Sequence, residues 1–270
     1  MAEISAQNVK ALRDSTGAGM MDAKRALVET GGDAVKAAAW LRERGLGKAA
    51  ERSARENVEG AVAVAITADG LAGAIVELKS ETDFGAKSPQ FVTLVNDLAV
   101  SIASLGEDAG LSRHAEQVDD LKVTIKENIE VGSVSRFEAP KDHVLSSYLH
   151  VQNGRGVNAV LVELDGGDGE MAHHVAVHIA FGRPGFLHRD EVPADAVAAE
   201  RASLEAQTRN EGKPEAALPK ILQGKLNGWF KRVPGGVLVE QPYAKDDKIS
   251  VATMLGDVSV VRFTQITVGG

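Results

Sequence analysis

The chain has 270 residues, a formal net charge of −8 at pH 7 and no cysteine. The lack of cysteine excludes disulfides, thiolate metal sites and thiol catalysis, and the acidic balance argues against direct contact with nucleic acid. No segment approaches the roughly 18 to 20 apolar residues of a membrane span, and the N-terminus lacks the pattern of a secretory signal. We therefore expect a cytoplasmic protein without membrane contact, long enough for two or three domains.

The first 50 residues predict three short helices that form a docking domain, residues 1–50. Ser5 and Asp33 are placed to cap the first and third helices, and Val9 follows Ser5 on the face expected to be buried. Gly45 is expected to end the third helix. The core positions predicted for that helix are Val35, Ala38 and Leu41.

Residues 46–57 are polar and predict a linker or a frayed helix, after which the hydrophobic period changes. The segments "EGAVAVAIT" and "LAGAIVELK" predict two strands joined by the turn "ADG". An amphipathic helix is expected after "TDFG" and a second one at about 116–131. Together these elements predict a first core subdomain over residues 51–140.

The same order of elements then recurs. "HVLSSYLHV", the turn "QNGRG" and "VNAVLVELD" predict a second hairpin, and "EMAHHVAVHIAFG" predicts a helix. Residues 190–234 predict an inserted antiparallel helical hairpin, after which "GVLVEQPY" and "VSVVRFTQITV" predict strands. We therefore expect a second subdomain over residues 141–270 and an α+β fold with two similar halves.

Residues 17–22 are the first candidate for a binding site. "GAGMMD" at residues 17–22 is rich in glycine but follows no strand and matches no phosphate-binding motif, so it indicates a helix break. Met20 and Met21 are adjacent on the second helix, so at least one should point outward, where a thioether suits an adaptable partner surface. Core filling by these methionines stays the alternative.

His173, His174 and His178 lie on one predicted helix, and the last two have the i, i+4 spacing of a metal pair. No carboxylate completes an H-E-x-x-H motif, so we expect no metal and favour a polar contact from the helix face for His178. No Ser-His-Asp order, nucleophile elbow or paired acids are present. The sequence thus predicts no enzyme activity and no cofactor.

The segment "TDFG" connects a predicted buried strand to a helix, in a chain with only 4% aromatic residues. Phe84 could fold back onto the core while Thr82 or Asp83 caps the following turn. The alternative is a displayed aromatic anchor of the kind that fills a pocket on a partner. The physical properties of these residues leave both interpretations open.

Three segments, "VKALRDSTGAGMMDAKRAL", "TDFGAK" and "HVAVHIAFGRPGF", together resemble the bacterial translation elongation factor Ts family. The resemblance implies a three-helix N-terminal domain similar to a ubiquitin-associated fold, two similar core subdomains and a helical-hairpin protrusion. It also implies a guanine-nucleotide exchange factor that binds elongation factor Tu in its GDP-bound and nucleotide-free forms. A scaffold or chaperone-like adaptor without exchange activity is the alternative.

The resemblance further implies which residues contact the partner. Phe84, with Thr82, Asp83 and Gly85 around it, would insert near the Mg²⁺ of the GTPase and dislodge it. The other implied contact residues are Leu12, Met20, Met21 and His178. Many members carry Val where this chain has Gly85, which is expected to loosen the loop, and the C-terminal helical extension of some relatives is lacking. A homodimer, and self-association of the hairpin at 190–234, stay open.

Overall fold

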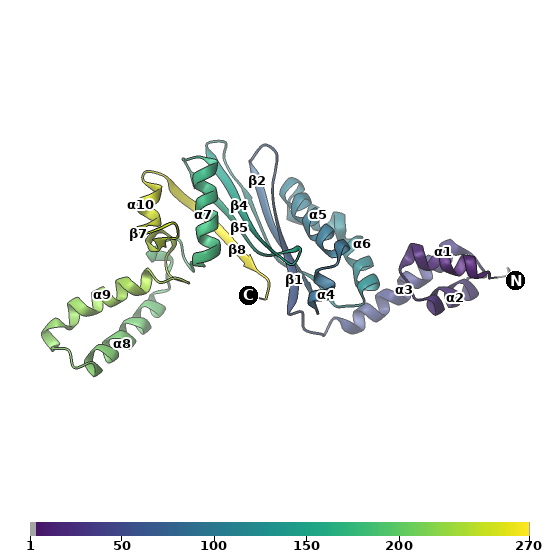
Figure 1. Ribbon diagram of the computed structural model, residues 1–270, viewed down its shortest axis with the longest axis horizontal. Helices are drawn as coiled ribbons and strands as arrows, with labels where there is room; N and C mark the ends of the chain where they lie inside the picture. The colour runs from purple at the N-terminus through teal and green to yellow at the C-terminus, as the bar shows by residue number, and fades with distance from the viewer. Residues whose placement is uncertain (1–3, 270) are drawn as a thin grey trace.

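The computed structural model describes residues 4–269, so the outermost residues of the first and last predicted domains lie outside the described residues. The molecule is elongated, with a three-helix unit at one end, two sheets with covering helices in the middle and a helical hairpin at the other end (Figure 1). This mixture of helices and sheets, with a helical N-terminal unit, confirms the predicted α+β class.

The N-terminal unit consists of α1 (Ala6–Thr16), α2 (Met20–Glu29) and α3 (Ala34–Arg52). Both predicted caps are present, since Ser5 Oγ accepts from the Asn8 N–H at 3.1 Å and the Asp33 carboxylate accepts from two N–H groups in the first turn of α3. A small core joins the three helices. Its buried members are Val9, Leu12, Ala23, Ala26, Leu27 and Ala37.

Two expectations for α3 are wrong. Val35 is 81% exposed, because Ala37 takes the core position instead. The helix also continues past Gly45 to Arg52, because Gly45 is a point of close helix packing and not a stop. A Cβ at Gly45 would lie 2.5 Å from Val123 Cγ1 of α6 (Glu107–Ile125), so only glycine lets the two helices approach this closely. Residue 50, the predicted domain limit, therefore lies within α3.

The first sheet is antiparallel with strand order β1-β2-β3. Its strands are β1 (Glu59–Ile66), β2 (Ala72–Ser80) and β3 (Ile129–Glu138), and β1 and β2 form the predicted hairpin. Between β2 and β3 the chain forms α4 (Asp83–Ala86), α5 (Pro89–Leu105) and α6, and α5 and α6 cover the outer face of the sheet (Figure 1).

The position predicted for α6, about 116–131, is wrong at both ends. Gly106, at φ 92°, ends α5, and the acidic residues Glu107 and Asp108 stabilise the start of α6. Lys126 adopts a left-handed conformation at φ 65° and ends the helix, so Ile129 opens β3 instead of extending α6.

The second sheet is also antiparallel, with strand order β4-β5-β8. Its strands are β4 (His143–Gln152), β5 (Arg155–Asp165) and β8 (Ser259–Thr267), and α7 (Gly169–Gly182) packs on its outer face. In both halves a hairpin is followed by helices and by a third strand that pairs with the second strand of the hairpin. The repeated pattern in the sequence thus corresponds to a repeated topology.

The segment between α7 and β8 forms the inserted hairpin and a small ribbon. The hairpin consists of η1 (Arg189–Glu191), α8 (Ala194–Asn210), η2 (Glu215–Ala217) and α9 (Leu218–Phe230). The chain returns through η3 (Leu238–Glu240), β6 (Pro242–Tyr243), β7 (Asp246–Ser250) and α10 (Val251–Leu255). The strand predicted for "GVLVEQPY" is therefore wrong, because this segment forms a 3-10 turn and only a two-residue strand.

The two sheets pack face to face between their covering helices. Alternate residues of β2 lie on opposite faces: Ile75 packs toward the second sheet, and Val76 packs toward α5 and α6. The buried layer between the sheets contains Val62, Ile75, Phe137, Ala159, Leu161 and Ile266. This four-layer order explains why the central strands are apolar on both faces. Among residues 4–269, every helix is too short or too polar to span a bilayer.

Candidate partner-binding surface

The connection from β2 to α5 displays Phe84. β2 ends at Ser80 and α5 is capped by Ser88, so the chain between them has room for only the single turn of α4. Thr82 Oγ1 caps that turn by accepting from the Gly85 N–H at 3.2 Å, and Gly85 and Ala86 are buried beneath it. Phe84 then projects from the opposite side and is 83% exposed. The alternative in which Phe84 folds back onto the core is therefore wrong for this structure.

Asp83 lies beside Phe84 and forms an ion pair with Lys87, four residues further on. The hydrogen bond from the Lys87 ammonium holds the pKa of the Asp83 carboxyl below its ordinary value. The Asp83 side chain is partly exposed, so the turn presents an ionised carboxylate next to a phenyl ring.

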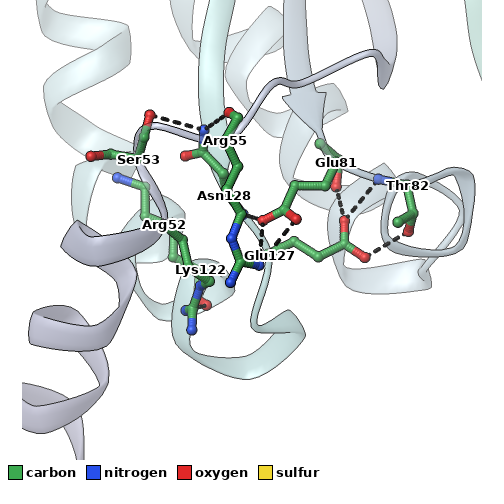
Figure 2. Close-up of polar contacts among 9 residues, drawn as sticks. Arg52, Ser53, Arg55, Glu81, Thr82, Lys122, Glu127 and Asn128 are labelled. Carbon is green, nitrogen blue, oxygen red and sulfur yellow. Dashed lines mark hydrogen bonds and ion pairs between the residues drawn. The ribbon is translucent and has the colours of Figure 1, made fainter.

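Beneath the turn, the carboxylate of Glu127 joins α4 to the connection between α6 and β3 (Figure 2). Glu127 Oε2 accepts from Ser80 Oγ at 2.6 Å and from the Thr82 N–H at 3.1 Å. Glu127 Oε1 accepts from Thr82 Oγ1 at 2.6 Å. One carboxylate thus fixes the end of β2 and the cap of α4 together.

The neighbouring residue, Asn128, holds the linker that leaves the N-terminal unit (Figure 2). Its buried side-chain amide donates to the carbonyl of Arg55 at 2.9 Å and to that of Ser53 at 3.4 Å. Its own N–H donates to Glu81 Oε1 at 2.6 Å, and Glu81 also pairs with the Arg55 guanidinium at 3.2 Å. The base of the Phe84 turn and the end of the N-terminal unit are therefore attached to consecutive residues.

Gly85 lies against the carboxylate that anchors the turn, and the expectation that it loosens the loop stays a prediction. A Cβ at this position would lie 2.5 Å from Glu127 Oε2 and 2.7 Å from Ser80 Oγ. The space that a larger side chain would need is filled by the carboxylate of Glu127, and Gly85 is buried within the helical turn. The absence of a side chain here permits a close polar contact.

Met20 and Met21 open α2 and are 48% and 69% exposed, so the start of this helix presents two thioether side chains to solvent. Leu12 is different, because it is buried in the core of the three-helix unit. The implied partner contact of Leu12 is therefore corrected to a packing role.

His178 is buried as well, against the expectation of an exposed position on its helix. Its Nδ1 accepts from the Ala244 N–H at 3.1 Å, so in the neutral ring Nε2 carries the proton and donates to Gln241 Oε1 at 3.0 Å. Burial lowers the pKa of His178, which favours this neutral form. The Gln241 amide in turn donates to the carbonyls of Gly182 and Arg232, both at 3.0 Å. His178 thus joins α7 to the base of the helical hairpin and offers no surface to a partner.

The other two histidines of α7 do not assemble a metal site around His178. The His173 ring lies 3.2 Å from the carbonyl of Ser147, and His174 lies 4.0 Å from Glu170 of its own helix. Within residues 4–269, no group of three or more His, Asp or Glu side chains is arranged to hold a metal ion.

Comparison with known proteins gives the family. The family described as Elongation factor TS matches residues 81–270, which is more than half of the chain. The chain belongs to the elongation factor Ts family. It is 42% identical to a protein named Elongation factor Ts from Streptomyces avermitilis and 43% identical to one of the same name from Nocardioides sp., over 100% of both chains in each case. A protein of that name from Clavibacter michiganensis is 42% identical over the same share. The family name places the chain among the elongation factors of protein biosynthesis.

The resemblance to elongation factor Ts did not point to Glu81, Glu127 or Asn128, although these residues organise the Phe84 turn. They belong to no motif, and each lies beside a charged or polar neighbour that looks like ordinary solvated surface. Glu127 and Asn128 also fall inside the helix predicted at about 116–131, so no local signal marked them as part of a connection.

Proposed function

We propose that this chain is a guanine-nucleotide exchange factor for elongation factor Tu and not an enzyme with covalent chemistry of its own. It binds the GDP form of the GTPase, disturbs the Mg²⁺ and phosphate sites and promotes release of GDP so that GTP can bind. The observation that carries this proposal is Phe84, 83% exposed on a turn whose base is fixed by hydrogen bonds.

The proposed mechanism uses Phe84 as a wedge. A GTPase holds GDP through its phosphate loop and a Mg²⁺ ion, and Mg²⁺ tolerates little departure from octahedral geometry. Burial of Phe84 between side chains near that ion contributes about 1.5–3 kcal/mol, and Asp83 supplies a polar contact that holds the displaced segment. Thr82 and Gly85 complete the turn that carries both residues.

One phenylalanine is not sufficient for exchange. A 10⁴-fold loss of GDP affinity needs about 5.5 kcal/mol of differential binding, and linkage makes GDP weaken factor binding by the same ratio. An extended interface of at least about 1,200 Å² is therefore required. We assign Met20 and Met21 to a second contact region within a docking domain of residues 1–50. The core subdomains, 51–140 and 141–270, supply the remainder.

The test is release of a fluorescent GDP from elongation factor Tu. The chain should accelerate release at concentrations well below that of the GTPase, because an exchange factor turns over. Binding to the GTPase without faster release would instead identify a scaffold or chaperone-like adaptor. Residues that are buried in the free chain, Leu12 and His178, are not among the proposed contacts.

A further inference from the structure

The carboxylate of Glu127 is the connection between the displayed turn and the rest of the core. It reaches Thr82 across 45 positions of sequence and bonds both the backbone N–H and the hydroxyl of that residue. Thr82 is itself exposed, so apolar burial does not hold it in place. From these contacts we infer that Glu127 is a positioning residue, which keeps Phe84 displayed for insertion into the partner.

The chemistry of the site suits a carboxylate. Ser80 Oγ, the Thr82 N–H and Thr82 Oγ1 all donate to Glu127, and an ionised carboxylate accepts at both oxygens. Hydrogen bonds to a charged acceptor are stronger than those between neutral groups. Glutamine has the same shape but accepts at only one oxygen, so it retains part of this arrangement. Alanine retains none of it.

The hydrogen bonds of Glu127 also restrict the position of Phe84. Phe84 lies between Thr82, which Glu127 holds, and Gly85, whose N–H returns to Thr82 Oγ1 at 3.2 Å. Glu127 also fills the space that a Cβ at Gly85 would occupy, so it supports the turn from beneath. Without the carboxylate, the cap of α4 loses its anchor, and the direction of Phe84 is no longer fixed. Ordering that turn would then have to be achieved during binding, which weakens the productive complex.

This inference rests on the proposed exchange function, but its first test does not. Amide hydrogen exchange in the free chain reports whether the turn is held. Glu127→Ala should remove protection at the N–H groups of Thr82 and Gly85, and Glu127→Gln should reduce it less. Asp97→Asn removes an exposed carboxylate on α5 and should change neither amide. Unchanged protection in Glu127→Ala would overturn the positioning role, whether or not the chain drives nucleotide exchange.

The second test measures GDP release from elongation factor Tu at saturating factor. Glu127→Ala should slow release about tenfold, and Glu127→Gln only about two- to threefold, with the melting temperature of each variant recorded. If Glu127 acts through Phe84, adding Glu127→Ala to Phe84→Ala should cause no further slowing. An additive effect in the double variant would show that Glu127 acts elsewhere and would overturn the inference.

The outcomes separate the two proposals. If the unaltered chain does not accelerate GDP release, the exchange function fails, and amide protection alone decides the role of Glu127. If Glu127→Ala does not fold, Glu127→Gln carries both tests, because its shape is conserved. Equal protection and equal release rates for Glu127→Gln and the unaltered chain would then reject the need for a carboxylate.

Discussion

The carboxylate of Glu127 occupies the space that a side chain at Gly85 would need: a Cβ on Gly85 would lie 2.5 Å from Glu127 Oε2. Gly85→Val should displace the carboxylate, break its bonds to Ser80 and Thr82, and cost about 1–3 kcal/mol of unfolding free energy. In a Glu127→Ala background the same substitution should cost less, because the carboxylate is gone, although Ser80 Oγ still lies 2.7 Å from the Cβ position. Urea unfolding of the unaltered chain, the two single variants and the double variant measures the coupling between Gly85 and Glu127.

Gly224→Val is the matched control for the Gly85 cycle, since Gly224 is an exposed helical glycine with no neighbouring atom within 4 Å of a Cβ. It reports the intrinsic effect of valine on a helix. Equal costs at Gly85 in the presence and absence of the Glu127 side chain would contradict the steric relationship.

Phe84→Ala should leave stability nearly unchanged, because an 83% exposed ring contributes little to the core. It should weaken the interaction that drives exchange by roughly 2–4 kcal/mol, as a central contact residue does. Asp83→Ala should have a smaller effect, and the two should be non-additive because they act on one segment. GDP-release rates should show the Phe84 defect more strongly in excess Mg²⁺, since the ion opposes the wedge.

Phe181→Ala is a control for the Phe84 prediction, because Phe181 on α7 is also exposed. If both variants slow exchange equally, the loss is not specific to the α4 turn. If Phe84→Ala instead destabilises the core by 3 kcal/mol or more, about the cost of deleting a buried phenyl ring, the displayed conformation is wrong.

The sequence predicted those features of the fold that depend on residues close together along the chain. Ser5 and Asp33 were recognisable as caps because the bonds they accept lie within three residues. The repeated hairpins were recognisable because a buried strand and its turn residues are adjacent in sequence. The partners of Glu127 and His178 were not, since they lie 45 and 63 positions away. A histidine in an apolar helix is compatible with burial or exposure, and the two groups that bond its ring, the Gln241 amide oxygen and the Ala244 N–H, lie far along the sequence.

The start of α2 should contribute to partner binding through Met20 and Met21. Replacing both with serine should weaken affinity for elongation factor Tu roughly tenfold by calorimetry and hardly change the melting temperature, because both side chains are substantially exposed. Val35→Ser is the control, since Val35 is an exposed aliphatic residue of the same unit. Equal weakening by Val35→Ser would argue against a specific contact at α2.

Leu12→Ala should act differently, by destabilising the three-helix unit by about 2–5 kcal/mol.

The close approach of α3 to α6 at Gly45 should fix how the N-terminal unit sits on the core. Gly45→Val would place a branched side chain against Val123, whose Cγ1 lies 2.5 Å from the Cβ position, so α3 should lift from α6. Small-angle scattering should then report a change in the dimensions of the free chain. Val123→Ala should partly restore the original packing in the double variant. If Gly45→Val leaves scattering and partner affinity unchanged, the contact does not set the orientation.

His178→Ala should destabilise the second subdomain, because it removes a buried ring and leaves the Ala244 N–H and the Gln241 amide oxygen without their bonds. We expect a loss of about 2–4 kcal/mol in urea unfolding. His174→Ala, on the same helix and partly exposed, should cost far less. A small cost for His178→Ala, together with slower GDP release, would instead support the partner contact that its burial argues against.

His178 and His143 should both make the free energy of unfolding depend on pH, and their two contributions should have opposite signs. Burial lowers the pKa of His178, so as pH falls below about 6.5 the unfolded chain binds a proton that the folded ring does not, and stability decreases. The hydrogen bond with Glu163 raises the pKa of His143, so its stabilisation is present below about 6.5 and is lost as pH rises through the folded value. Unfolding at pH 5.5 and 7.5 separates the two contributions. Relative to the unaltered chain, His178→Asn should lose less stability on acidification, and His143→Gln should lose more. The reverse order would show that folding shifts the two pKa values in the directions opposite to those stated here.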